Sequence, residues 1–307
     1  MLVTGAAGFL GAHVVDALIR RGHDVRALVR PASDVAWREE VDVRRLDLRG
    51  RDGLSEALEG VDVVVHLAAQ MTGSDEARFA GTVVATENLL AGMSAAGVRR
   101  LVLASSYSVY DWSRIGPDLD ESSPLESSVY ERDGYAVAKL WQERVVRRAE
   151  ALDLTVLRPG YIWGGEPVAG VGPRIGPVQI VLGPLGRLPL THVANCADCF
   201  VAAAENARAL GATLNVDDGH GVRTWRYARD AGCGPLRVPV PYAVAFAIVR
   251  AVYVVARALL GPRLRLPSIF VPRRFEARFK PVRTSHAEIE RVLGWRPPLS
   301  YEEALRQ

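Results

Sequence analysis

The sequence predicts an α/β protein with a doubly wound parallel sheet and a smaller, mostly helical C-terminal domain. Three observations predict this fold class. Short runs of Val, Leu and Ile alternate with helical stretches as far as about residue 160, which is typical of a buried parallel sheet. At the start of the chain, a strand leads straight into a glycine-rich turn and a helix. Residues 236–307 have a mostly helical pattern.

The expected elements follow one another as βαβ units, whose strands are parallel. The strand-like runs are residues 1–3, 24–30, 41–47, 61–69, 99–106 and 154–160. The helical stretches between them are residues 12–22, 54–60, 82–97 and 136–153.

The turn after the first strand has the spacing GxxGxxG, formed by Gly5, Gly8 and Gly11. Such a turn is tight and lets a pyrophosphate approach the backbone, where it meets the free N–H groups at the positive end of the helix. The sequence therefore predicts a Rossmann-type dinucleotide site. The expected cofactor contacts in this turn are Gly5, Ala7, Gly8, Phe9, Leu10 and Gly11.

The domain organisation changes after residue 160. Residues 164–189 are rich in Gly and Pro, which is typical of irregular structure on the substrate side. A helix is expected again at 193–209 and a strand at 213–218. We therefore expect a dinucleotide-binding domain over 1–163 with 190–218 returning to it, and a substrate-binding domain formed by 164–189 and 219–307.

Composition narrows the class of protein. The 307 residues are 49% hydrophobic and 24% charged, which excludes a disordered chain, a collagen-like repeat and a disulfide-stapled mini-domain. Cys196 and Cys199 form a CxxC, but no second pair completes a zinc site, so no metal is expected. The chain opens on a structural motif rather than a leader peptide, so we expect a cytoplasmic protein. We expect a small-molecule substrate and no nucleic-acid partner.

The end of the second strand bears on the choice of cofactor. Sites that prefer NAD usually place an acid there, whereas this sequence has Arg30, which can neutralise a 2′-phosphate. We therefore expect NADP, with NAD as the alternative if Arg30 stacks on the adenine or faces solvent. Asp47, followed by Leu48, is a candidate acceptor for the adenine amino group. Small residues after the fourth strand would let the cofactor pass, and we expect contacts from Leu67, Ala68 and Ala69.

Three residues form a candidate catalytic set. Tyr135 and Lys139 are four apart on an expected helix and so share one face, and Ser106 ends a parallel strand at its carboxyl edge, where such sheets bind ligands. A nearby ammonium favours the phenolate and lowers the pKa of a tyrosine, while a serine hydroxyl polarises the substrate oxygen. Only Lys139 and Lys280 are lysines among 38 Lys+Arg, and a compact ammonium at Lys139 is one that arginine replaces poorly.

These motifs carry a family resemblance over essentially the whole chain. The matching stretches are TGAAGFLG, HLAA, LASSYSVY, YAVAK, LRPG and LGWRP. The chain resembles the extended short-chain dehydrogenases/reductases, the superfamily of NAD-dependent epimerases/dehydratases. Its pattern is closest to the branch of the 3β-hydroxysteroid dehydrogenases and dihydroflavonol reductases. The resemblance implies hydride transfer at the nicotinamide, with Tyr135 as acid/base, Lys139 holding the ribose and tuning the tyrosine, and Ser106 orienting the carbonyl or alcohol. It also implies that Pro159 and Gly160 lie beside the nicotinamide.

Departures from the nucleotide-sugar members bear on the substrate. Tyr161 stands where those members usually carry Asn, and the stretch 188–193 offers no arginine at the matching place, so two diphosphate contacts are lost. Arg273 and Arg274 could still hold phosphates, which keeps a nucleotide-sugar substrate open. We expect loops 70–80, 107–134 and 164–190 to shape the pocket. The expected substrate contacts are Gln70, Tyr107, Ser108, Tyr161 and Trp163.

Charge is unevenly distributed along the chain. The whole chain carries +3, but residues 237–283 carry +9 with one acid, so the remainder carries −6. This segment contains the apolar run 242–261, interrupted only by Arg250 and Arg257. Three interpretations stay open: a helix packed in the substrate domain or at a subunit contact, peripheral membrane association through 242–283, and binding of an anionic substrate or carrier. A homodimer also stays open.

Three functions are compatible with these motifs. The first is an NADP-dependent oxidoreductase that interconverts a ketone and a secondary alcohol on a non-nucleotide, apolar small molecule. The second is a nucleotide-sugar epimerase or dehydratase that retains NAD(P). The third is a non-catalytic, cofactor-sensing regulator, which would not need the set of Ser106, Tyr135 and Lys139.

Overall fold

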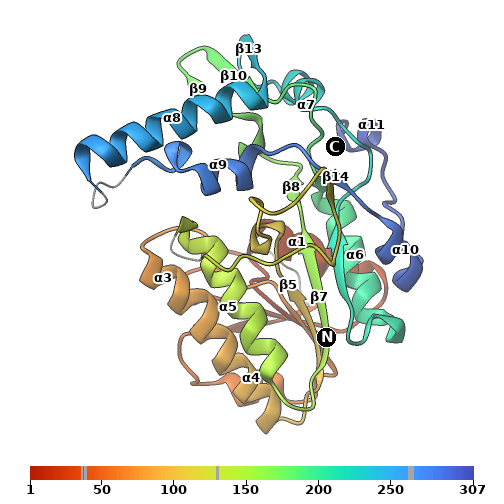
Figure 1. Cartoon of the computed structure of the whole chain (residues 1–307). Coiled ribbons are helices and arrows are strands. Elements are labelled where there is room, and N and C mark those ends of the chain that lie inside the picture. The colour runs from red at the N-terminus through yellow and green to blue at the C-terminus, as the bar shows by residue number, and fades with distance from the viewer. Residues whose placement is uncertain (36, 38–39, 129–130, 262–265) are drawn as a thin grey trace.

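A computed structural model of the chain describes residues 1–35, 37, 40–128, 131–261 and 266–307. Its centre is a seven-stranded, all-parallel sheet in the order β12-β7-β5-β4-β1-β2-β3 (Figure 1). The strands are β1 (Leu2–Thr4), β2 (Val25–Val29), β3 (Val41–Arg45), β4 (Val63–His66), β5 (Arg100–Ala104), β7 (Asp153–Pro159) and β12 (Thr213–Val216). The order reverses between β1 and β4, which confirms the Rossmann-type doubly wound fold.

Helices cover both faces of this sheet, as expected for strands buried on both sides. One face packs against α1 and α6, and the other against α2, α4 and α5. The helices of this half are α1 (Phe9–Arg20), α2 (Leu54–Leu58), α3 (Asp75–Phe79), α4 (Ala85–Ala95), α5 (Gly134–Arg148) and α6 (Val193–Glu205). A single π-helical turn, Ala80–Val84, joins α3 to α4.

The boundaries of several helices differ from those expected, among them those of the first helix and of α5. The first helix begins at Phe9 rather than residue 12, so its first turn is already part of the glycine-rich segment. The helix expected to reach residue 153 ends at Arg148, because Asp153 already pairs with Arg100 as the first residue of β7. Both differences arise at element ends, where local sequence patterns are least informative.

The rest of the chain forms a smaller, mostly helical region with short strands. Its pairs are β6 (Asp118–Leu119) with β14 (Arg283–Thr284), and β8 (Tyr161–Trp163) with β11 (Leu190–His192). A three-stranded sheet contains β9 (Arg174–Ile175), β10 (Val178–Leu182) and β13 (Leu236–Val240). The helices are α7 (Thr224–Asp230), α8 (Tyr242–Leu260), α9 (Pro272–Phe279), α10 (Ala287–Leu293) and α11 (Tyr301–Ala304).

One part of the C-terminal region packs away from its neighbours in sequence. Ile289, Val292 and Trp295 belong to the same hydrophobic cluster as α1 and α6. The stretch around α10 thus lies on the cofactor side of the molecule. This differs from the expectation that all of 219–307 belongs to the substrate-binding domain. The division into two domains otherwise stays a prediction.

Candidate active site

A cavity of about 1070 Å³ opens at the carboxyl ends of the strands. It is lined by all fifteen residues expected to contact the cofactor and by the three expected to be catalytic. Four of the five expected substrate contacts, Gln70, Tyr107, Ser108 and Tyr161, line it as well. The fold therefore brings together expected site residues that lie up to 156 positions apart in the sequence, the distance from Gly5 to Tyr161.

The glycine-rich turn packs tightly on its own backbone and on the loop after β4, and side chains at its glycines would prevent this packing. Gly5 has φ +68°, and a Cβ there would lie 2.8 Å from the backbone nitrogen of Ala68. A Cβ on Gly11 would lie 2.8 Å from the Cα of Ala6. The first turn of α1 carries no acidic residue, so its free N–H groups and positive end point to an anion without competition. These features fit the pyrophosphate of a dinucleotide.

The expected nicotinamide end is equally crowded. A Cβ on Gly160 would collide with the carbonyl oxygen of Pro189 and would lie 3.2 Å from the Pro189 Cβ. Pro159, the last residue of β7, and Gly160 both line the cavity. Only a residue without a side chain fits at position 160, beside the place where a flat ring would lie.

The opposite end of the cavity carries Arg30 and Asp47. Arg30 is exposed just after β2, and its Nη1 lies 3.5 Å from Oε1 of Gln70. Asp47 accepts hydrogen bonds from the guanidinium and backbone N–H of Arg49, and these hold the pKa of its carboxyl below the ordinary value. Asn88 donates to the carbonyls of Leu48 and Arg49, at 3.0 Å each, and so fixes this loop.

Ser106, Tyr135 and Lys139 meet at the centre of the cavity. Ser106 follows β5, and Tyr135 and Lys139 lie one turn apart on α5. The side chain of Asp133 accepts from the backbone N–H of Ala136 at 3.1 Å, which fixes the start of α5 directly before Tyr135. Ser106 and Tyr135 share a side-chain hydrogen bond. Both residues line the cavity.

The protonation states of this set are governed by burial. Burial raises the pKa of Tyr135 to about 12, although the hydrogen bond with Ser106 acts in the other direction. Burial lowers the pKa of Lys139 to about 7, with the charge of Glu143 opposing. The expectation that Lys139 lowers the pKa of Tyr135 in the cofactor-bound site stays a prediction. In this structure the ammonium of Lys139 donates to the carbonyl of Ala104 at 2.7 Å and to Oε1 of Gln142 at 2.8 Å.

Gln142, Thr86 and His66 form a buried polar network behind Lys139 that the sequence did not predict. The amide nitrogen of Gln142 donates to Oγ1 of Thr86 at 2.9 Å and lies 3.2 Å from Nε2 of His66. His66 also contacts Oγ1 of Thr4 at 2.6 Å through Nδ1, and burial lowers its pKa to about 3, so it is neutral. Gln142 thus connects Lys139 to the first and fourth strands. The available signal was a polar residue three positions after Lys139 on the same helix face.

Replacing Gln142 by methionine is expected to lower kcat/KM by about tenfold or more, because the ammonium of Lys139 loses a hydrogen bond of the charged type. Gln142→Glu places a carboxylate beside Lys139 and should raise its pKa, so the alkaline limb of the pH profile moves upward. The measurement is the pH dependence of kcat/KM. Gln179→Met, at a buried glutamine bonded to the carbonyl of Gly172, is the matched control and should leave the pH profile in place. An unmoved profile for Gln142→Glu contradicts the role of Gln142 in positioning Lys139.

A buried ion pair supports the same helix. Glu143 accepts from Nε and Nη2 of Arg158 on β7, at 2.9 and 2.8 Å. The hydroxyl of Ser105 also donates to Glu143, and Arg158 donates to the hydroxyl of Tyr110 at 3.0 Å. The pair therefore connects α5, which carries Tyr135, to the ends of β5 and β7.

At the substrate end, the expected contacts differ in their freedom to bind. The hydroxyl of Tyr107 donates to Asp217 at 2.7 Å, and the hydroxyl of Tyr161 donates to the carbonyl of Arg278 at 2.8 Å. Oγ of Ser108 is buried and has no hydrogen-bond partner among the described residues, so it is available to a ligand. Trp163 does not line the cavity.

Trp163 requires a correction. Its ring packs against His192, Tyr227 and Tyr301 in a buried cluster of the C-terminal region. Residues two apart in a strand share a face, and Tyr161 packs against the same cluster as Trp163, but the cavity reaches only Tyr161. We therefore leave it out of the candidate site.

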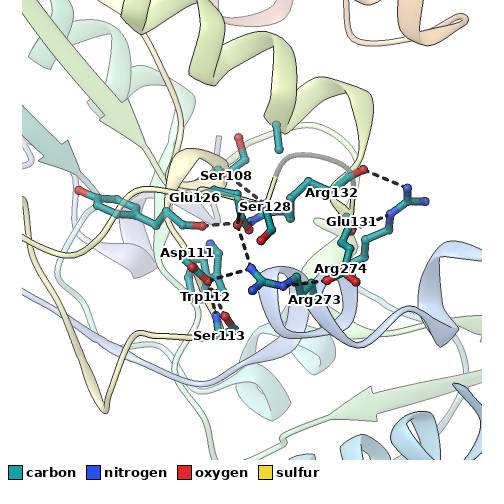
Figure 2. A network of polar contacts seen from close by, with 12 residues as sticks. Ser108, Asp111, Trp112, Ser113, Glu126, Ser128, Glu131, Arg132, Arg273 and Arg274 are labelled. Atoms are coloured by element: carbon teal, nitrogen blue, oxygen red, sulfur yellow. Dashed lines mark hydrogen bonds and ion pairs between the residues drawn. The ribbon is translucent and has the colours of Figure 1, made fainter. Parts of the chain in front are cut away.

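Arg273, which kept phosphate binding open, is already paired (Figure 2). Its Nη1 lies 2.8 Å from Glu126 and 3.4 Å from Asp111, and its Nε lies 2.9 Å from Glu131. Glu126 also pairs with buried Arg132. Arg273 therefore links α9 to the loop after β5. It does not line the cavity.

Arg274 and Arg278 of α9 do line the cavity. Arg274 donates to the backbone carbonyls of Glu131 and Arg132. The expected pocket loops do not include α9, whose Arg274, Ala277 and Arg278 line the cavity.

Comparisons with known proteins agree with this geometry. A family model described as the NAD dependent epimerase/dehydratase family matches residues 1–217. A 3 beta-hydroxysteroid dehydrogenase/Delta 5-->4-isomerase of Mycobacterium tuberculosis (strain CDC 1551 / Oshkosh) is 32% identical over 258 residues, covering 76% of this chain and 69% of the relative. A 2-alkyl-3-oxoalkanoate reductase of Stenotrophomonas maltophilia is 29% identical, covering 100% of this chain and 97% of the relative. Among solved structures, a short-chain dehydrogenase/reductase superfamily protein of Agrobacterium tumefaciens with bound NAD has a TM-score of 0.73 and 23% identity, covering 99% of this chain and 94% of that one.

Proposed function

The chain belongs to the NAD-dependent epimerase/dehydratase family and is an NAD(P)-dependent oxidoreductase, and from this premise we propose that it interconverts a ketone and a secondary alcohol on an apolar, non-nucleotide small molecule, with NADP as the preferred cofactor. The observation that carries the proposal is the shared cavity. The pyrophosphate cradle around Gly5 and Gly11 and the hydroxyl pair of Ser106 and Tyr135 line the same space.

Each catalytic side chain has a defined task in this proposal. The hydroxyl of Ser106 donates a hydrogen bond to the carbonyl oxygen of the substrate and holds it beside Tyr135. Tyr135 donates its proton to that oxygen as the alcohol forms, and accepts it back in the reverse direction. Lys139 holds the ribose hydroxyls, and its charge stabilises the phenolate that Tyr135 becomes. The nicotinamide, when bound, supplies or accepts the hydride.

The walls of the cavity support an apolar substrate. The sides beyond Ser108 include apolar side chains from several elements, namely Met71, Trp112, Pro167, Val168, Ala169 and Ala277. The two named relatives act on a steroid and on an alkylated oxoalkanoate, which are ketones or alcohols with large apolar parts. The nucleotide-sugar alternative has lost Arg273 as a phosphate ligand, since that side chain contacts three carboxylates.

Net cofactor turnover tests the proposal. Purified protein mixed with NADPH and a panel of apolar ketones, including a 3-ketosteroid and a long-chain 3-oxoacid, is expected to oxidise NADPH in proportion to the alcohol formed. A protein that reduces none of these ketones, but retains its cofactor and epimerises or dehydrates a nucleotide sugar, would support the alternative instead.

Arg30 is the basis of the NADP preference. Replacing Arg30 by serine is expected to lower kcat/KM for NADPH by about 10- to 100-fold, because a charge-assisted contact with the 2′-phosphate is lost, and to leave the value for NADH nearly unchanged. Steady-state kinetics with both cofactors measure the split. Arg44→Ser removes another exposed arginine, on β3 and outside the cavity lining, and should affect neither cofactor. Equal losses of kcat/KM with both cofactors would show that Arg30 does not distinguish NADPH from NADH through the 2′-phosphate.

A further inference from the structure

Helix α8 has an apolar outer face that no described part of the chain covers. Only 11% of Tyr242–Leu259 is buried, and within the described residues α8 is the one helix long and apolar enough to cross a membrane by length and composition. In Figure 1, α8 projects beyond α9 and away from the sheet. Of the interpretations open for 242–261, a helix packed in the core is therefore wrong, whereas a subunit contact and membrane association stay predictions.

Five of the exposed apolar side chains of α8 form one continuous stripe, whereas Val254, 63% exposed, lies outside it. They recur at intervals of three or four residues, which places them on a single helix face. Ile248 is 55% exposed, Val255 54% and Leu259 77%. The full set of large apolar residues in the stripe is Val244, Ile248, Val252, Val255 and Leu259. No charged residue lies on this face.

The opposite face of α8 packs against the rest of the protein. Ala245 and Val249 are buried against Phe275 and Phe279 of α9 and Leu182 of β10. This anchoring holds α8 along the surface of the fold, so it lies beside a membrane more readily than across one.

The charges of the segment favour an anionic partner. Arg250 and Arg257 lie on the margin of the helix away from the stripe, and Arg257 packs over the ring of Tyr253 at 5.1 Å. Residues 237–283 carry +9 in the sequence, but Arg273 and Arg283 are paired with carboxylates elsewhere in the fold, and Arg263 and Arg265 lie outside the described residues. The cations on α8 itself are Arg250 and Arg257, and anionic lipid headgroups attract such charges.

Helix α9 connects this face to the active site. Its Phe275 and Phe279 pack beneath α8, while Arg274, Ala277 and Arg278 of the same helix line the cavity. A substrate dissolved in the adjoining bilayer would therefore have one helix between it and Tyr135.

We propose that the outer face of α8 docks on an anionic membrane surface, with its apolar stripe in the lipid interface, and thereby exposes the cavity to apolar substrates held in the bilayer. The docking stands on α8 alone, and the substrate route rests on the proposed function. An apolar helix flanked by arginines binds such an interface through buried apolar area and electrostatic attraction together.

The test is sedimentation of the full chain, loaded with NADP, with vesicles of phosphatidylglycerol and phosphatidylcholine in equal parts, and with vesicles of phosphatidylcholine alone. The unmodified protein is expected to bind the anionic vesicles, less strongly at high salt, and to bind the neutral ones at least about fivefold more weakly. Val255→Glu and Leu259→Glu should each lower anionic binding by about tenfold or more. Leu210→Glu, at a residue 47% exposed on the cofactor side, is the matched control and should leave binding unchanged.

Each contrary result overturns the docking. These results are no vesicle binding, binding that Val255→Glu leaves intact, and a dimer in light scattering that Val255→Glu dissociates without any vesicle binding. Activity on a short, water-soluble ketone should be equal in Val255→Glu and Leu210→Glu, whereas reduction of a long-chain ketone held in anionic vesicles should fall only in Val255→Glu. Vesicle binding without reduction of any ketone would leave the docking intact and contradict the proposed function.

Discussion

Replacing Tyr135 by phenylalanine is expected to lower kcat for ketone reduction by about 10²- to 10⁴-fold, the range that general acid–base catalysis contributes. The phenol is the proton donor in our mechanism, it is held by Ser106, and the substitution removes only its hydroxyl. Binding of NADPH, measured by fluorescence titration, should change little, because the cradle around Gly5 and Lys139 is untouched. Retained turnover in Tyr135→Phe would mean that another group supplies the proton.

The pH profile adds a signature to this experiment. Since burial raises the pKa of Tyr135 to about 12, the phenol is protonated throughout the neutral range. Reduction, which needs the proton on Tyr135, should therefore not lose activity through this group as pH rises from 6 to about 9, well below a pKa near 12. Oxidation of the alcohol needs the phenolate and should accelerate with pH. The same acceleration in Tyr135→Phe would assign it to a different group.

Replacing Arg158 by methionine is expected to destabilise the protein by about 3–5 kcal/mol, because it leaves the buried carboxylate of Glu143 with only the partly exposed Arg147 as an ionic partner. The side chains of both partners are only 3% exposed. Urea unfolding at neutral pH measures the loss. Burial alone would raise the pKa of Glu143, but the hydrogen bonds and charge of Arg158 outweigh it and hold the pKa below the ordinary value. The stabilisation is therefore present above the pKa of an unfolded glutamate, and the gap between the two proteins should narrow as pH falls below about 4.3.

Arg147 offers a matched control on the same carboxylate. It pairs with Glu143 at 3.3 Å, but its side chain is 40% exposed. Arg147→Met should cost no more than about 1 kcal/mol, as is usual for a solvent-exposed pair. If the two substitutions destabilise the protein equally, burial of the Arg158 pair is not what makes it important.

The parts of the site that the sequence predicted are those with a local pattern. The turn of Gly5, Gly8 and Gly11 and the pair of Tyr135 and Lys139 each lie within one short segment, so spacing alone places them on a turn or a helix face. Ser106 was predictable because a parallel strand ends next to it, and the carboxyl ends of such strands meet at one edge.

The parts that were missed depend on contacts between distant segments. Gln142 reaches His66 and Thr86 only when α5 packs on the sheet, and no spacing in the sequence shows that pairing. Arg273 was expected to be free for phosphate because its carboxylate partners lie more than 140 residues earlier.

Trp163 was assigned wrongly, and α8 was left open between three interpretations, for a different reason, which is the direction of their side chains. A three-residue strand gives too few positions to tell which face is buried, so Trp163 was assigned to the cavity. The apolar run of α8 has the composition of a core helix, and only the packing reveals that most of it faces outward.

The central claim, net ketone reduction at the cavity of Ser106, Tyr135 and Lys139, is tested most directly by isotope transfer. NADPH carrying deuterium at the transferred position of the nicotinamide is incubated with the protein and an apolar ketone, and the alcohol is analysed by mass spectrometry. We expect one deuterium on the carbinol carbon for each NADPH oxidised, and transfer at least about 10²-fold slower with Tyr135→Phe. Product that carries no deuterium, from a protein whose cofactor stays bound and is not consumed, would contradict the account.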